Sequence, residues 1–299
     1  MTARFTLGIH QEPICLPDTY RSSLVVYSGY QTLRVAGEAG IARVTIDNPP
    51  VNVLDVALMT DLRDLLTALR DDRSVRVIVF DSADPEFFIA HVDMTSTPDA
   101  LAGLAATAPE GVNVFQAVGE MLRRQPQVTI VKLAGKARGG GAEFVAAADM
   151  AFAAIGRAGL GQIEALMGIV PGGGGTQYLA ARVGRNRALE AVLGAELFDA
   201  ELAERYGWIN RALPADELDA FVDRIARDIA ALPEGVIVAA KQAIVPDDLS
   251  AGLVRENDAW AGLVFRPVAG HLISGGLAAG AQTRDGERDL ETLMRNLAG

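Results

Sequence analysis

The sequence predicts an α/β protein, and two observations support this fold class. Short apolar runs rich in valine and isoleucine alternate with longer segments whose apolar residues recur at helical spacing. This alternation is typical of helices packed on a sheet. Helix-forming sequence then dominates from Asp216 to the C-terminus. We therefore expect a mixed core of strands and helices, followed by a helical C-terminal region.

The expected strands are apolar runs bounded by turn residues, and the expected helices show an apolar stripe or helix-favouring composition. The strands cover residues 32–35, 41–46, 75–80 and 128–133. The helices cover residues 56–69, 113–124, 142–148, 173–183, 186–193, 218–231 and 234–244. Asn48-Pro49-Pro50 ends the second strand because proline cannot continue a ladder. Asp55 is a candidate N-cap for the first helix.

Composition limits the classes of function. The chain has 299 residues, of which 50% are hydrophobic and 22% are charged, values typical of globular proteins. Its formal net charge of −11 argues against nonspecific binding of nucleic acid or of an anionic membrane surface. A local basic pocket could still hold a phosphate-bearing ligand.

Cysteine and histidine usage restricts the compartment and the cofactors. The single cysteine, Cys15, excludes an intrachain disulfide framework and indicates a reducing compartment, so we expect a cytoplasmic protein. The three histidines are scattered without metal-ligand spacing, and we expect no metal. Residues 1–30 lack the apolar core of a signal peptide, and no later run is long enough to span a membrane. We interpret them as an N-terminal extension.

The stretch from Val131 to Gly175 carries the strongest functional signal. The 128–133 strand leads into small residues with three consecutive glycines, Gly139 to Gly141, and then into a helix. The first N–H groups of a helix lack partners and lie at the positive end of its dipole, so they can bind a developing oxyanion. Glu143 follows Gly140 by about one turn and can project from the same side. Such donors stabilise charge on oxygen while a carboxylate moves a proton.

Other interpretations of these residues are available. Three glycines before a helix also serve as a tight turn, and a glutamate in a first turn also favours the helix dipole. A P-loop is rejected because Ala142 follows the glycines, where that motif needs lysine and then serine or threonine. The run from Gly172 to Thr176 also lacks the lysine.

Three motifs occur in order: GKARGGGAE from Gly135, GQIE from Gly161, and GIVPGGGGTQ from Gly168. As an ordered set they resemble the pattern of the enoyl-CoA hydratase/isomerase (crotonase) superfamily, and the resemblance covers residues 32–245 well. It implies a crotonase-like spiral of repeated β-β-α units in residues 31–213. In residues 214–299 it implies C-terminal helices that cover the active site and build a homotrimer, often paired into a hexamer.

The resemblance also implies a site. The substrate would be an acyl-CoA thioester, with coenzyme A as part of the substrate and no separate cofactor. FIAHVD, beginning at Phe88, matches the family's F-x-A-G-A-D, in which we assign the residue before the glycine as the first oxyanion-hole donor. That residue is Ala90, and Gly140 supplies the second donor. The remaining implied substrate and coenzyme contacts are Val53, Leu54, His91, Val92, Asp93, Gly139 and Gly172.

Two of these positions have open alternatives. His91 replaces the family's usual glycine, which puts the substrate in doubt. Its ring could narrow the coenzyme channel, hydrogen-bond the ligand, or simply occupy a permissive backbone angle. Residues 52–54 are equally consistent with an ordinary strand-to-helix loop.

The resemblance implies that Glu143 activates water and Glu164 handles the proton at the α-carbon. Two acids favour an enoyl-CoA hydratase, because isomerases of the family generally need only one. The alternatives are an isomerase, another crotonase-type lyase or hydrolase, and a non-catalytic member that binds acyl-CoA. RNA binding, known for some relatives, would want a basic face, whereas this chain is acidic.

Overall fold

The computed structural model describes residues 27–298, so the proposed N-terminal extension lies almost entirely outside the described residues, as do Cys15 and His10. The strands are β1 (Leu33–Glu38), β2 (Ile41–Ile46), β3 (Val77–Ser82), β4 (Phe87–Ile89), β5 (Val128–Leu133), β6 (Lys136–Arg138), β7 (Met150–Ala154), β8 (Gly159–Gly161), β9 (Phe198–Asp199) and β10 (Arg211–Leu213). The helices of the first part are α1 (Val56–Asp71), α2 (Pro98–Ala105), α3 (Val114–Arg123), α4 (Gly140–Ala147), the 3-10 helix η1 (Glu164–Met167), α5 (Gly175–Val183), α6 (Arg185–Gly194) and α7 (Ala200–Tyr206). Those of the second part are α8 (Leu218–Ala230), α9 (Val236–Ala243), α10 (Ser250–Val264), α11 (Pro267–Ala278), α12 (Arg284–Glu287) and α13 (Leu290–Ala298).

The strands form two sheets. One has the order β1-β2-β3-β5-β7-β10 and the other has the order β4-β6-β8-β9. Only the β1–β2 and β8–β9 pairs are antiparallel among these neighbours. Each turn of the chain adds one strand to the first sheet and the next strand to the second, as β3/β4, β5/β6 and β7/β8 do. This confirms the expected spiral of repeated units.

Helix α1 shows how the sequence determines a local element. Its N-cap is Asp55, whose Oδ1 accepts a hydrogen bond from the Leu58 N–H at 2.8 Å, as expected. The leucines at helical spacing are buried against the large sheet and join the main hydrophobic core. All the expected strands and helices are present, with ends shifted by a few residues. The short strands β4, β6, β7, β8, β9 and β10 and the short helices α2 and α7 were not expected, because such short segments carry little periodicity.

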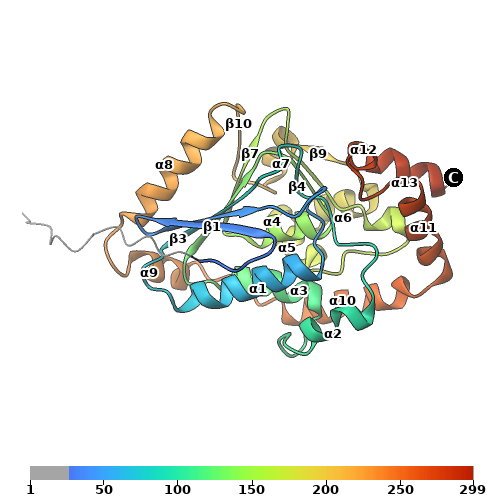
Figure 1. The fold of residues 1–299 in the computed structure, drawn as a ribbon, viewed down its shortest axis with the longest axis horizontal. Coiled ribbons are helices and arrows are strands. Elements are labelled where there is room, and N and C mark those ends of the chain that lie inside the picture. The colour runs from blue at the N-terminus through green and yellow to red at the C-terminus, as the bar shows by residue number, and fades with distance from the viewer. Residues whose placement is uncertain (1–26, 299) are drawn as a thin grey trace, which may run out of the picture.

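The C-terminal helices are distributed over two ends of the molecule. Figure 1 shows α8 beside the large sheet and α11 to α13 together at the opposite end. Leu272 of α11 and Leu290 and Met294 of α13 pack with Ile163 and Met167, next to and within η1. This apolar cluster holds η1, and therefore Glu164, in place. Along residues 27–298, no helix combines the length and the apolarity that crossing a membrane requires.

Candidate active site

Glu143 lies in the first turn of α4, which starts directly after Gly139. Gly139 adopts a φ of 47°, and a Cβ at this position would lie 2.9 Å from Oε1 of Glu164. The backbone angle and the close approach both require glycine. The Glu143 side chain is buried, and its Oε1 accepts hydrogen bonds from the N–H groups of Gly173 at 2.8 Å and Gly175 at 2.9 Å. The first and third glycine-rich motifs therefore meet at this carboxylate.

Glu164 is the first residue of η1 and is also buried. The contact with Gly139 places its carboxylate against the start of α4. When the Gln162 amide is oriented to satisfy its neighbours, its nitrogen donates to both oxygens of Glu164, at 3.2 and 3.0 Å. Burial raises the pKa of Glu164 to about 8. Near neutral pH this acid therefore retains its proton.

A third buried carboxylate, Glu256 of α10, completes the group. Its Oε1 accepts from the Gly174 N–H at 2.6 Å and from Gln116 Nε2 at 3.0 Å, and its Oε2 accepts from the Thr176 N–H at 2.8 Å. Glu256 and Glu143 thus divide the unpaired N–H groups at the start of α5 between them. Burial raises the pKa of Glu256, while these hydrogen bonds act in the opposite direction.

The pKa of Glu143 also lies well above its usual value. Burial is the largest cause, and the negative charges of Glu164 and Glu256 add to it. The N–H groups of Gly175 and Gly173 favour the charged form. These two donated hydrogen bonds are the feature of the site that favours a charged Glu143.

The expected oxyanion-hole donor at Ala90 is wrong, for a geometric reason. The Ala90 N–H donates to the Val51 carbonyl at 3.3 Å, and the residue is fully buried in a small cluster with Val51 and Phe87. The neighbouring parallel bridge between Leu54 and Val92 uses the Leu54 and Asp93 N–H groups. Among the described residues, the Val92 N–H has no acceptor.

Val92 and Gly140 face each other. A Cβ on Gly140 would lie 2.6 Å from Cγ2 of Val92, 3.1 Å from Cδ2 of Leu54 and 3.7 Å from the Val92 nitrogen. The Gly140 N–H, in the first turn of α4, likewise has no acceptor within the part of the chain that the structure describes. Two N–H groups without acceptors among the described residues, those of Val92 and Gly140, therefore lie close together near Glu143.

The interpretation of His91 as a ligand contact is also wrong. The side chain is 3% exposed and both ring nitrogens are engaged within the protein, with Nδ1 2.7 Å from the Val92 carbonyl oxygen and Nε2 2.9 Å from Oε1 of Glu287. Nor does the residue occupy a left-handed backbone angle. The neighbouring Asp93 carboxylate accepts hydrogen bonds from Thr95, Ser96 and Gln282.

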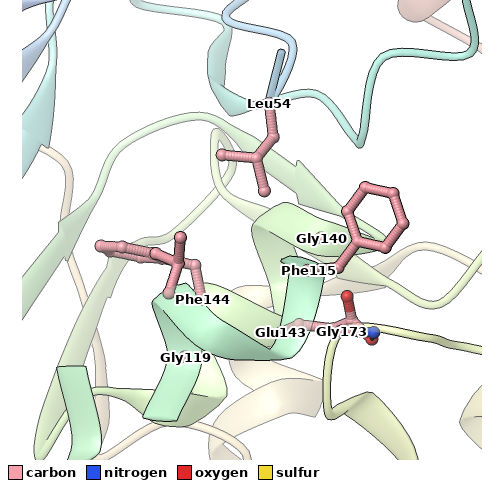
Figure 2. Close-up of a pocket in the computed structure, with 8 residues that line it drawn as sticks. Leu54, Phe115, Gly119, Gly140, Glu143, Phe144 and Gly173 are labelled. Atoms are coloured by element: carbon pink, nitrogen blue, oxygen red, sulfur yellow. The ribbon is translucent and has the colours of Figure 1, made fainter. Parts of the chain in front are cut away.

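A narrow cavity leads to Glu143 and is shown in Figure 2. Its lining brings together four elements of the site, namely the loop before α1, α3, α4 and the third glycine-rich motif. The lining residues are Leu54, Phe115, Val118, Gly119, Gly140, Glu143, Phe144 and Gly173. Val53 packs with Val51, Phe87 and Ala90 instead. Gly172 lies against the indole of Trp260, which a Cβ would approach to 2.7 Å, and its carbonyl accepts from Asn113 Nδ2 at 2.8 Å.

Sequence reasoning missed Glu256, Trp260 and the residues that contact His91. The first two lie in RENDAW, a segment that resembles the family only weakly. For the contacts of this region, the sequence contained one signal, Arg138. It lies among small and apolar residues that are expected to be buried, and a buried charge requires a partner. The identity of that partner was not available from local sequence.

Replacing Glu256 by glutamine is expected to lower the free energy of unfolding by about 1–3 kcal/mol, because the four surrounding groups are all donors and an amide nitrogen cannot accept from them. Chemical denaturation of both proteins measures this difference. Asp258→Asn, an exposed change on the same helix, is the control. Equal loss in the two variants would show that the buried hydrogen bonds are not the cause.

Comparisons with known proteins identify the family of this chain. The family model described as "Enoyl-CoA hydratase/isomerase" matches residues 36–264. A crystal structure from Streptomyces avermitilis, provisionally described as an enoyl-CoA hydratase, shares 71% identity and superposes with a TM-score of 0.89, covering 90% of this chain and 99% of that one.

Curated relatives are more distant. A Mycobacterium tuberculosis protein described as a probable enoyl-CoA hydratase is 31% identical over 233 residues, which is 76% of this chain and 88% of the relative. The crotonyl-CoA hydratase of Syntrophomonas wolfei is 28% identical over 240 residues, 79% of this chain and 90% of the relative. The chain has the crotonase fold and belongs to the enoyl-CoA hydratase/isomerase family.

Proposed function

We propose that this protein is an enoyl-CoA hydratase, which adds water across the 2,3 double bond of a 2-enoyl-CoA. The observation that carries the proposal is a pair of buried glutamates in different environments beside two unengaged N–H donors. Burial raises the pKa of both acids, that of Glu164 to about 8, and Glu143 accepts hydrogen bonds from two glycine N–H groups that favour its charged form. Two acids whose environments separate their protonation states can divide base and acid work.

The thioester carbonyl would lie between the N–H groups of Val92 and Gly140. Both donors point to where negative charge develops on oxygen as the enolate forms, and they act without competing water. The acyl chain would extend along the apolar wall of Leu54, Phe115 and Phe144. Coenzyme A is part of the substrate, so the reaction requires no separate cofactor.

The two glutamates would then transfer the protons. Water adds through its oxygen to C3 while one of its protons passes to the Glu143 carboxylate, and Glu164 delivers its proton to C2. The bond from C3 to oxygen and the bond from C2 to hydrogen form as the double bond is lost. The resting state returns when the proton on Glu143 is transferred to Glu164.

Hydration of crotonyl-CoA tests this proposal. We expect loss of the conjugated enoyl-thioester absorbance together with formation of 3-hydroxybutyryl-CoA, identified by mass spectrometry. Conversion of a 3-enoyl-CoA to the 2-enoyl isomer without hydration would favour an isomerase. Binding of crotonyl-CoA without turnover would favour a non-catalytic acyl-CoA-binding protein.

The raised pKa of Glu164 predicts the alkaline limb of the pH profile. Its proton is the one donated to carbon, so kcat is expected to fall as pH rises through about 8. At low pH the pair becomes fully protonated and the base is lost, so kcat also falls there. Measurement of kcat with saturating crotonyl-CoA from pH 5 to pH 10 would show this bell shape. A kcat that stays constant well above pH 8 would contradict the acid role.

We also infer a homotrimer, with a hexamer as the alternative, and a cytoplasmic location. The oligomer follows from the resemblance together with large apolar side chains that are exposed in the single chain, among them Ile244 at 80% and Phe265 at 76%. The location follows from the single cysteine. Light scattering coupled to size-exclusion chromatography distinguishes a 31.5 kDa chain from its trimer or hexamer.

A further inference from the structure

A buried cluster of charged side chains connects both arms of the proposed oxyanion hole to the C-terminal helices. His91 immediately precedes Val92, and Arg138 lies two residues before Gly140. The carboxylate of Glu287, at the end of α12, lies between them, with Oε1 2.9 Å from His91 Nε2 and Oε2 3.5 Å from Arg138 Nη1. The exposed fractions of these three side chains are 3%, 0% and 0%.

The contacts of His91 tie its ring to Glu287 and to the backbone of Val92. Nε2 faces the Glu287 carboxylate and Nδ1 faces the Val92 carbonyl oxygen, and both of these groups are acceptors. Both ring nitrogens of His91 are therefore engaged inside the protein. Although burial alone would raise the pKa of Glu287, the hydrogen bond and charge of His91, the Gln282 N–H and Arg138 hold that pKa below its usual value. Glu287 is therefore held in its charged form between His91 and Arg138.

The Arg138 guanidinium donates hydrogen bonds to the C-terminal helices from each of its nitrogens. Its Nε and Nη2 donate to the two carboxylate oxygens of Glu291 on α13, at 2.6 and 2.9 Å, and its Nη1 donates to the Glu287 carbonyl at 3.0 Å. The cluster thus places two basic side chains, His91 and Arg138, against two carboxylates. Because each charge is buried or nearly so, removing one leaves its partner uncompensated.

The same C-terminal segment also binds the rest of the loop that follows His91. The Gln282 N–H donates to Oε1 of Glu287 at 2.8 Å. The Gln282 side chain accepts a hydrogen bond from the Met94 N–H at 2.6 Å and donates one to Asp93 Oδ1 at 3.0 Å. The loop that presents the Val92 N–H is therefore held by residues almost two hundred positions later in the chain.

We propose that Glu287 is a positioning residue that sets the separation and orientation of the Val92 and Gly140 N–H groups. It acts through His91 on one arm and through Arg138 on the other. Tying both arms to one carboxylate prevents them from separating as charge develops on the thioester oxygen. This inference rests on the proposed function. It also gives a role to His91, which replaces the glycine usual in the family.

A chromophoric ligand tests the position of the two donors directly. 4-Dimethylaminocinnamoyl-CoA absorbs at longer wavelength when its carbonyl oxygen accepts stronger hydrogen bonds, so the shift on binding reports the strength of the oxyanion hole. In Glu287→Gln we expect a smaller shift and a kcat for crotonyl-CoA lowered about 10- to 100-fold, with KM changed little, because the lost interaction acts mainly in the transition state. Asp285→Asn, which removes a carboxylate that is 92% exposed from the same helix, is expected to match the wild type.

The outcomes separate this inference from the proposed function. Absence of a shift in the wild-type protein would contradict the oxyanion hole itself. A wild-type shift that is retained in Glu287→Gln, with unchanged kcat, would overturn the positioning role, and so would an equal loss in Asp285→Asn.

A second variant guards against failure of Glu287→Gln to fold. His91→Gly combined with Glu287→Gln removes both members of this contact together, and Arg138 keeps its ion pair with Glu291. This double variant is expected to show the same reduced shift. A full wild-type shift in it would overturn the inference.

Discussion

Glu164→Gln is expected to lower kcat for crotonyl-CoA hydration by about 10²–10⁴-fold, the range typical of a lost general acid or base. Glutamine is nearly the same size and keeps a hydrogen bond to Gln162, but it has no proton to donate to C2. Glu143→Gln is expected to cause a loss of similar size, since the amide oxygen still accepts from Gly173 and Gly175 while water has no base.

The pattern of kinetic constants identifies the step that is lost. We expect kcat and kcat/KM to fall together, because both glutamates act in the transition state rather than in binding. Glu201→Gln, an exposed change on α7, serves as the control. If either active-site variant kept kcat within a few-fold of the wild type, its glutamate would have no acid–base role, and single-acid chemistry such as double-bond isomerisation would become the better assignment.

Gly140→Ala has the second largest expected effect. The backbone angle of Gly140 suits any residue, but its new Cβ would lie 2.6 Å from Cγ2 of Val92 and 3.1 Å from Cδ2 of Leu54. One arm of the hole must move away from the other. Loss of one oxyanion-hole donor costs about 2.7–4 kcal/mol of transition-state stabilisation, so we expect kcat to fall by about 10²–10³-fold.

Two measurements separate this effect from misfolding. Gly262→Ala places a Cβ in open space on α10 and is expected to retain wild-type kcat. The shift of bound 4-dimethylaminocinnamoyl-CoA should decrease in Gly140→Ala and persist in Gly262→Ala. Wild-type kcat in Gly140→Ala would mean that the thioester oxygen does not bind between Val92 and Gly140.

Local sequence predicted those parts of the site that depend on short-range geometry. Gly139 and Gly140 precede a helix start, and Glu143 follows one turn later, so their mutual arrangement is determined within a few residues. The Asp55 cap and the leucine face of α1 were predictable for the same reason. Strands β6 and β8 were not expected, but they fit the expected spiral. Each follows a strand of the large sheet and adds a strand to the second sheet.

The choice between Ala90 and Val92 needed the tertiary structure. Motif position alone assigned the donor to Ala90, yet the bridge between Leu54 and Val92 determines which N–H groups of this loop are used. Adjacent residues in extended backbone direct their N–H groups to opposite sides. Ala90 and Val92 are two positions apart, so their N–H groups point to the same side but meet different partners. Only the register against the 51–54 loop separates the two residues.

The sequence by itself determined the fold class and the family pattern, and it singled out Glu143, Glu164 and Gly140 as site candidates, because each depends on neighbours within one motif or on the order of motifs. Only the tertiary structure decided that Val92 is the free donor, that Glu256 caps α5, and that His91 is paired with Glu287 rather than with ligand. His91 and Glu287 are 196 residues apart. A buried charge is stable only beside a partner, and that partner is supplied by whichever distant segment the folded chain brings into contact.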